Sequence, residues 1–357
     1  MASSDITFRD ITFASTENAT FKGHAWEPAS APRAIVQIAH GMSEYINRYD
    51  DFARYLAGQG ILVCGSDHSG HGENAESADA WGVLPAKGGT DILVEDFHLM
   101  RLAMEDIYGT KLPYYVFGHS MGSFVVRAYI ARHGGGLNGA IICGTGHNPK
   151  AVCQFGGVLA RFIAKTKGDD YRSKFLNGLA DGAYAKAIPD ARTPFDWLNT
   201  DPQKVDEYIE DPACGFMFSA GGYAALMGLT TEVADTSKIN AIAKDLPVFF
   251  IAGEGDPVGN MGKGVQTVYG MFKDAGIRDV ECKIYPGMRH EILNEPGHLE
   301  VYEDVLAWIN THLMKESAPE QAELDRLAAA AAEAARAAAK AAEAADAALA
   351  AVEGKEA

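Results

Sequence analysis

The sequence lacks the cysteine pattern of a disulfide-stabilised or zinc-binding protein. It has five cysteines, an odd number, and no two of them are spaced as Cys-x-x-Cys. Scattered single thiols are typical of proteins from reducing compartments rather than of secreted frameworks or cysteine-rich metal sites. We therefore expect reduced thiols and a cytoplasmic location.

Long apolar runs and positive charge are also scarce. No apolar run approaches the roughly 18 residues that a membrane-spanning helix needs. The amino terminus shows no basic segment followed by an apolar stretch, so we expect neither a signal peptide nor a transmembrane segment. The 31 Lys and Arg residues against 48 Asp and Glu residues give a net charge of −17. This charge opposes binding to nucleic acid and to anionic membranes.

Short apolar runs alternate with helical patterns along most of the chain. Nearly continuous apolar runs of this kind are typical of strands that helices cover on both faces. The alternation predicts an α/β protein with a mostly parallel sheet of eight strands and helices on both faces. The predicted strands cover 5–13, 20–27, 34–39, 61–64, 114–118, 138–144, 246–252 and 280–285, and the longer helices cover 48–58, 89–108 and 297–314.

Two segments depart from this alternation. Between 147 and 235 the helical patterns are short and no buried strand recurs, which predicts a mainly helical cap inserted into a core made of 1–146 and 236–316. Residues 317–357 are rich in alanine, with charges three or four residues apart, and alanine is the best helix former. We expect a solvated helical tail; a coiled-coil or partner-binding arm is the alternative, although large apolar residues are few. The oligomeric state stays open.

The most informative motif is Gly118-His119-Ser120-Met121-Gly122. A predicted buried strand ends at Gly118, and an apolar helical pattern begins at Ser123. Gly-x-Ser-x-Gly in this strand–turn–helix context is the pattern of a nucleophile elbow, in which a strained turn holds the serine hydroxyl clear of the sheet. Ser120 is therefore the predicted nucleophile.

A serine hydroxyl needs an imidazole to take its proton and a carboxylate to orient that imidazole. His290 follows the predicted strand 280–285, and Asp256 follows the strand 246–252. Because the carboxyl ends of parallel strands meet at one edge of a sheet, both side chains should lie near Ser120. Glu254 in the same loop is the competing carboxylate. The order Ser120, Asp256, His290 along the chain fits a catalytic triad.

Two backbone N–H groups are expected to form the oxyanion hole: that of Met121, directly after the serine, and that of Met42, after the strand 34–39. His119 is interpreted as a packing residue of the turn. His40, His68 and His71 could also suggest a metal site, but these loops need polar, turn-forming residues in any case and no further protein ligand has suitable spacing. No metal is predicted.

The chain resembles the α/β-hydrolases, and within them the monoacylglycerol lipase and lysophospholipase group that carries the serine aminopeptidase S33 domain. The matching motifs are His40-Gly41-Met42-Ser43-Glu44, Arg48-Tyr49, Asp67-His68-Ser69-Gly70-His71-Gly72, the Ser120 motif, Gly255-Asp256-Pro257-Val258 and His290-Glu291. Proline peptidases that share the domain usually carry Gly-Gly-Ser-Trp-Gly at the elbow, and this chain does not.

The resemblance implies an esterase that acts through an acyl-enzyme on a monoacylglycerol, lysophospholipid or similar monoester, with no metal and no organic cofactor. A peptidase or amidase with the same triad is the alternative, and a non-catalytic scaffold that uses the tail is a more distant one. The predicted cap is rich in apolar side chains, which suits an acyl chain but also suits attachment of the cap to the core. The candidate substrate contacts are Phe155, Leu159, Phe162, Phe216, Phe218 and Leu226.

Overall fold

The structure is a computed structural model that describes residues 6–180 and 182–314. Contacts within the chain divide it into a large unit that ends at Leu306 and a C-terminal unit that begins at Ala307. A final helix begins at His298, and the described residues end in it at Met314. The predicted alanine-rich tail, 317–357, lies outside the described residues.

The large unit is built on one eight-stranded sheet with the order β1-β2-β4-β3-β5-β6-β7-β8. The pairs β1–β2 and β2–β4 are antiparallel, and all the other pairs are parallel. This confirms the predicted fold class. The strands are β1 (Thr7–Ala14), β2 (Thr20–Glu27), β3 (Ala34–Ala39), β4 (Ile61–Ser66), β5 (Tyr114–His119), β6 (Gly139–Cys143), β7 (Val248–Gly253) and β8 (Val280–Tyr285).

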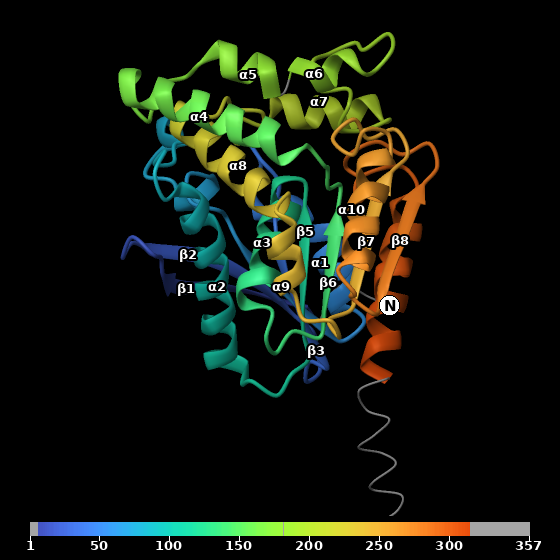
Figure 1. Cartoon of the computed structure of the whole chain (residues 1–357). Helices are drawn as coiled ribbons and strands as arrows, with labels where there is room; N and C mark the ends of the chain where they lie inside the picture. Colours follow the sequence, from blue (N-terminus) through green and yellow to red (C-terminus); the bar gives the residue numbers. More distant parts are fainter. Residues whose placement is uncertain (1–5, 181, 315–357) are drawn as a thin grey trace, which may run out of the picture. The chain divides into compact units, whose positions relative to one another are not determined.

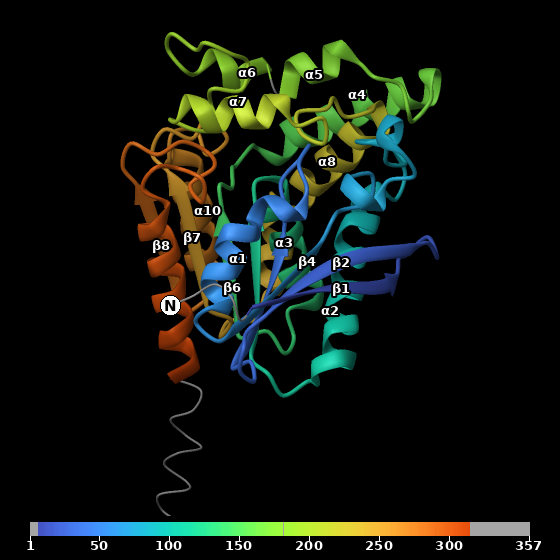
Figure 2. The same ribbon diagram turned by 180° about the vertical axis from the view of Figure 1, so that it is seen from behind.

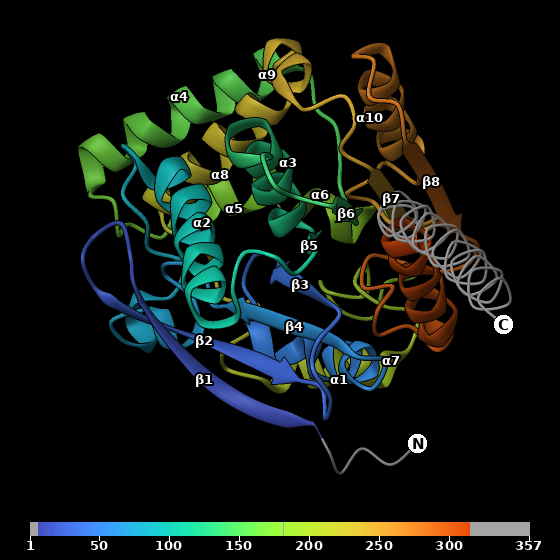
Figure 3. The same cartoon turned by 90° about the horizontal axis from the view of Figure 1, so that it is seen from below.

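Helices cover both faces of this sheet. Figure 3 shows α1 on one face and α2 and α3 on the other. The central strands β3, β5, β6 and β7 carry almost only buried side chains, as expected for strands that are covered on both faces. The helices that cover the sheet are α1 (Asp50–Ala57), α2 (Gly89–Tyr108), α3 (Met121–His133) and α10 (Lys263–Asp274).

The regular elements that the structure describes in the segment predicted as a cap are all helices, and α4 to α7 gather at one end of the large unit (Figures 1 and 2). The last helix of the segment, α8, packs against α4 and also against α2 and α3, and its Tyr223 and Ala224 belong to the main hydrophobic core. The boundaries 147 and 235 stay a prediction. The helices are α4 (Lys150–Lys167), α5 (Lys174–Ala180), α6 (Gly182–Lys186), α7 (Pro202–Glu210) and α8 (Ala220–Val233), with α9 (Thr236–Ala241) after them.

The helix predicted over 48–58 is preceded by one turn of 3₁₀ helix, Ile46–Tyr49. The Ile46 N–H donates to the Asp67 carboxylate at 2.8 Å, which satisfies a backbone donor that the helix itself leaves free. The segment between β3 and α1 is therefore fixed by the loop after β4. Within the described residues, no helix has both the length and the hydropathy needed to cross a bilayer.

Candidate active site

Ser120 occupies the sharp turn between β5 and α3. Its backbone has φ 54° and ψ −120°, a strained conformation for a residue with a side chain, and its N–H donates to the Cys143 carbonyl at 3.0 Å. A Cβ on Gly118 would lie 2.3 Å from the Gly122 carbonyl oxygen, so the motif needs glycine to let strand and helix approach. Ser120 is half-buried, whereas residues 114–119 are buried.

His290 and Asp256 meet at the carboxyl edge of the sheet, in the loops after β8 and β7. His290 Nδ1 and Asp256 Oδ2 lie 2.9 Å apart, close enough for an ion pair when the imidazole is protonated. Both side chains are almost completely buried. Asp256 Oδ1 also accepts the Val258 N–H at 2.8 Å, which fixes the carboxylate.

The competing carboxylate, Glu254, lies elsewhere in the same loop. It is exposed, and its Oε2 accepts the Gly287 N–H at 3.2 Å. The geometry therefore places Asp256 rather than Glu254 beside His290.

The predicted oxyanion loop after β3 is anchored on both sides of Met42. The Gly41 N–H donates to Glu44 Oε1 at 2.5 Å, and the Ser43 N–H donates to His71 Nε2 at 3.3 Å. Ser43 has a positive φ of 56°, which bends the chain after Met42. The loop lies against the nucleophile, because a Cβ on Gly41 would come within 3.2 Å of the Ser120 Cβ. Met42 and Ser120 are thus held in the same region.

His40, His68 and His71, the alternative metal ligands, are hydrogen-bonded to the main chain. His40 Nδ1–H donates to the Gly41 carbonyl at 2.8 Å, and its Nε2 accepts the His68 N–H at 2.9 Å. His71 Nδ1–H donates to the Ser69 carbonyl at 3.1 Å. Burial lowers the pKa of both His40 and His71 to about 3, and it lowers the pKa of His68 well below its ordinary value. Neutral imidazoles therefore shape these two loops.

A buried ionic network connects the oxyanion loop with the residue after His290. Arg48 donates two hydrogen bonds to Glu291, at 2.7 and 2.9 Å, and a third to Glu44 at 2.6 Å. Burial opposes the charge on Arg48, but Glu291 and Glu44 outweigh it and raise the pKa of the guanidinium. Burial likewise raises the pKa of Glu44, but Arg48 together with His119 and His40 outweighs it, and the pKa falls well below its usual range. The sequence motifs contain these residues, but sequence reasoning gave them no role.

His119 packs beside His290, as its interpretation as a packing residue requires. The two ring centroids are 4.7 Å apart, and His119 Nε2 lies 3.2 Å from the His290 carbonyl oxygen. Burial lowers the pKa of His119, but the hydrogen bond and charge of Glu44 outweigh it, so the pKa is raised. His119 therefore packs against the loop that carries His290.

The six candidate substrate contacts in the helical insertion have different environments. Phe218 is completely buried and packs against His71 with ring centroids 5.3 Å apart, so it attaches the insertion to the loop after β4. Phe155 and Phe162 on α4 are 73% and 63% exposed. Leu159 and Phe216 are half-buried against the core, and Leu226 is buried. Their contact with a substrate stays a prediction.

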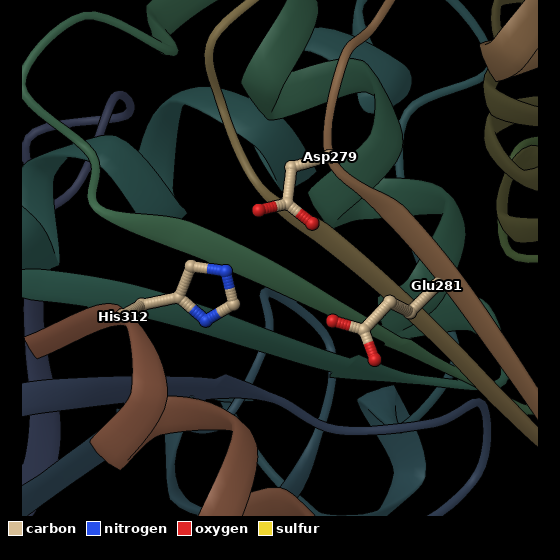
Figure 4. A group of neighbouring side chains, drawn as sticks. All are labelled: Asp279, Glu281 and His312. Atoms are coloured by element: carbon tan, nitrogen blue, oxygen red, sulfur yellow. The ribbon is translucent and has the colours of Figure 1, made fainter. Parts of the chain in front are cut away.

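A group of acidic side chains lies outside this site. Asp279 and Glu281 stand at the start of β8 (Figure 4), whereas His290 follows the other end of the strand. Asp279 is half-buried and Glu281 is exposed, which is common for carboxylates on the edge strand of a sheet. His312, also labelled in Figure 4, belongs to the C-terminal unit, where its Nδ1–H donates to the Trp308 carbonyl at 2.7 Å.

The fold and the site together define a class. A strained serine between β5 and α3, with aspartate and histidine in the loops after later strands of a mostly parallel sheet, is the arrangement of an α/β-hydrolase. Comparison with known proteins agrees: residues 30–297 match the family described as serine aminopeptidase, S33. The chain belongs to this family and is a serine hydrolase.

Several relatives resemble the chain over most of its length. It is 32% identical to a monoacylglycerol lipase of Mycolicibacterium smegmatis, over 81% of this chain and 92% of the relative, and 24% identical to the human monoglyceride lipase, over 80% and 85%. Its structure is similar to that of a thermostable carboxyl esterase from Bacillus coagulans solved in complex with glycerol. That similarity has a TM-score of 0.80 and 33% identity and covers 86% of this chain and 99% of the esterase.

Proposed function

We propose that the protein is a carboxylester hydrolase that cleaves monoacylglycerols or similar lipid monoesters through an acyl-enzyme on Ser120. The observation that carries this proposal is the convergence of four segments: the strained Ser120 turn, the loops of Asp256 and His290, whose side chains lie 2.9 Å apart, and the Gly41–Met42 loop against the serine. The relatives named monoacylglycerol lipase and carboxyl esterase support the ester as the bond that is cleaved.

In the acylation step, Ser120 Oγ attacks the ester carbonyl carbon while His290 Nε2 accepts the hydroxyl proton. Asp256 keeps the proton on Nδ1 and stabilises the imidazolium that forms. The Met121 and Met42 N–H groups donate to the oxyanion, and each such donor lowers the barrier by roughly 3–4 kcal/mol. Collapse of the intermediate breaks the bond to the alcohol oxygen, which takes the proton from His290.

In the deacylation step, water replaces the alcohol. His290 takes a proton from the water as its oxygen attacks the acyl carbon, and the same two N–H groups hold the oxyanion. The intermediate then releases the fatty acid, and the proton on His290 returns to Ser120 Oγ. The products are one alcohol and one carboxylic acid, and the enzyme is unchanged.

The apolar side chains of the insertion support an acyl chain as the group next to the serine. Phe216 packs against Phe218 and His71, and the Phe216 carbonyl accepts the Ser43 hydroxyl at 2.7 Å. This contact brings an aromatic side chain of the insertion to the oxyanion loop. We assign Leu159, Phe216 and Leu226 to the acyl side of the site, where an apolar wall favours an alkyl chain over a peptide.

Active-site labelling combined with a substrate panel tests the proposal. A fluorophosphonate probe should label the wild type and not Ser120→Ala. A monoacylglycerol should be turned over faster than a lysophospholipid and much faster than a proline anilide. Equal labelling of Ser120→Ala would overturn the mechanism, and a preference for the anilide would favour the peptidase alternative.

We also propose a cytoplasmic location. All five cysteines are free thiols, and four of them are buried. Burial raises the pKa of Cys64 to about 12, so this thiol is protonated and unreactive. Thiols of this kind are typical of a reducing compartment.

A further inference from the structure

Residues 196–200, between α6 and α7 of the helical insertion, lie directly against the loop that carries His290. The Trp197 ring centroid is 5.0 Å from that of His290, with 45° between the ring planes. Trp197 is half-buried, and His290 is almost completely buried. An indole that comes from the insertion therefore forms part of the wall around the predicted general base.

The main chain of this segment is bonded to both neighbours of His290. On one side, Arg289 Nη1 donates to the carbonyl oxygens of Asp196 and Asn199, at 2.5 and 3.0 Å. On the other side, the Glu291 N–H donates to the Leu198 carbonyl at 2.8 Å. His290 thus stands between two residues that are both fixed to the insertion.

Glu295 joins the last residue of the segment, Thr200, to the residue before His290. Its Oε1 accepts the Thr200 N–H at 3.0 Å and the Arg289 N–H at 2.8 Å, and its Oε2 accepts the Thr200 hydroxyl. Glu295 is 1% exposed, whereas Thr200 is exposed, so these bonds are partly shielded from water. One buried carboxylate ties the end of the segment to the residue before His290.

The bonding is unusual for two loops that only touch. A loop on the surface of a core would satisfy its carbonyl oxygens with water, but three carbonyl oxygens of this one, those of Asp196, Leu198 and Asn199, accept donors from the His290 loop. Partly buried hydrogen bonds of this kind help to hold a geometry, because a polar group that loses its partner is not fully compensated by water. The position of the insertion therefore constrains the position of His290.

We propose that residues 196–200 act as a positioning element for His290, and that Trp197 is the positioning residue that holds the imidazole in its productive orientation. This inference rests on the proposed function, because it assigns His290 the role of general base. Trp197 acts through His290 and not on the substrate. Displacing a catalytic group by about 1 Å costs on the order of a hundredfold in rate, so small movements of this segment matter.

Trp197→Leu tests the proposal when turnover is counted per reactive serine. We expect kcat per fluorophosphonate-titrated site to fall about 10- to 100-fold, with KM for a short soluble ester changed less than twofold. Trp197→Phe keeps an aromatic face against His290 and should recover most of the loss. Phe195→Leu is the matched control, because it removes the ring of the residue directly before this segment, and that ring packs against Tyr208 instead.

A second variant tests the main-chain bonds. Arg289→Gln removes the two bonds to the carbonyl oxygens of Asp196 and Asn199 and should lower kcat in the same way. If both residues act through the same positioning element, the combined variant Trp197→Leu/Arg289→Gln should lose less than the product of the two single effects. The far-downfield proton NMR signal of His290 Nδ1–H should broaden or shift in both single variants and not in Phe195→Leu.

The outcomes separate this inference from the proposed function. If the wild type is labelled at Ser120 and hydrolyses esters, but Trp197→Leu and Arg289→Gln match it per titrated site, only the positioning role is wrong. If the wild type is not labelled at Ser120, the proposed function itself fails. If Trp197→Leu lowers the number of titrated sites and leaves kcat per site unchanged, Trp197 supports folding alone and the inference is overturned.

Discussion

Glu44 illustrates how one buried carboxylate can serve two loops. Its Oε1 accepts the Gly41 N–H at 2.5 Å and the Tyr49 hydroxyl at 2.8 Å, and its Oε2 accepts Arg48 at 2.6 Å. Arg48 in turn holds Glu291, the residue after His290. The loop of Met42 and the loop of His290 are therefore linked by three charged side chains, those of Glu44, Arg48 and Glu291.

The three histidines of the loops after β3 and β4 make stability depend on pH. In the folded protein, burial lowers the pKa of His40 and His71 to about 3 and lowers that of His68 as well. The unfolded chain takes up protons below pH about 6.5, the ordinary pKa of histidine. Because the unfolded state then binds more protons, stability is fully present above pH 6.5 and is lost as the pH falls towards 3.

We expect each of these histidines to cost about 1.4 kcal/mol of unfolding free energy between pH 7.5 and pH 5.5. His71→Gln should lose that part of the pH dependence, because a glutamine oxygen can still accept the Ser43 N–H but does not titrate. Urea unfolding at the two pH values measures the difference. If wild type and His71→Gln lose the same free energy on acidification, His71 is not buried as a neutral imidazole.

At the scale of the elements, α3 holds both ends of the helical insertion. Arg127 on α3 donates to the Thr145 hydroxyl and to the Gly146 carbonyl, each at 3.1 Å, and to the Val233 carbonyl at 3.0 Å. Gly146 precedes the predicted cap, and Val233 lies at its end. Burial lowers the pKa of Arg127 to about 9, since its contacts are carbonyl and hydroxyl oxygens rather than a carboxylate. Burying the Arg127 charge therefore costs folding free energy. Its three hydrogen bonds hold together the two chain segments that enter and leave the insertion.

Arg127→Met should loosen the insertion more than it destabilises the whole protein. Removing a poorly compensated buried charge offsets part of the loss of three hydrogen bonds, so we expect a change in unfolding free energy of about 1 kcal/mol or less. Limited proteolysis should cut between residues 147 and 235 several-fold faster than in the wild type.

The matched control is Arg101→Met on α2. Arg101 also bonds to main-chain carbonyls, but it is paired with Glu105 at 2.7 Å and contacts the end of α3 rather than the insertion. Its loss should cost about 2 kcal/mol or more and leave cleavage within 147–235 unchanged. Equal cleavage rates for Arg127→Met and wild type would show that Arg127 does not hold the insertion.

Local sequence patterns account for the elements but not for the contacts between loops. The helix α2 and the strand β8 have the bounds that periodicity predicts, and the Ser120 turn follows from its glycines. The bond between Arg48 and Glu291 joins residues 243 positions apart, and no periodic pattern relates them. The contact of Trp197 with His290 likewise depends on how two irregular segments pack. These contacts come from tertiary structure alone.

For the molecule as a whole, net charge is a poor guide to the surface of the insertion. The chain has a net charge of −17, which on its own predicts weak binding to anionic membranes. Between residues 150 and 180, however, there are six Lys and Arg residues against two Asp residues, a local charge of +4. The same segment exposes large apolar side chains, namely Val152, Phe155, Val158, Phe162, Phe175 and Leu179. A basic, apolar helical surface is suited to an anionic lipid interface.

We therefore expect the protein to sediment with vesicles that contain anionic phospholipid, and to do so less as salt is raised, because five of the six basic residues are exposed. Phe155 and Phe162 are two turns apart on α4 and share one face, so Phe155→Ser/Phe162→Ser should reduce binding at least several-fold.

Leu102→Ser, at an exposed leucine of α2, is the control and should bind as the wild type does. Equal binding to neutral and anionic vesicles, or binding that the double variant leaves intact, would rule out this surface as the contact. The prediction follows from the local charge and exposure of residues 150–180, and it is the opposite of what the negative net charge of the whole chain predicts.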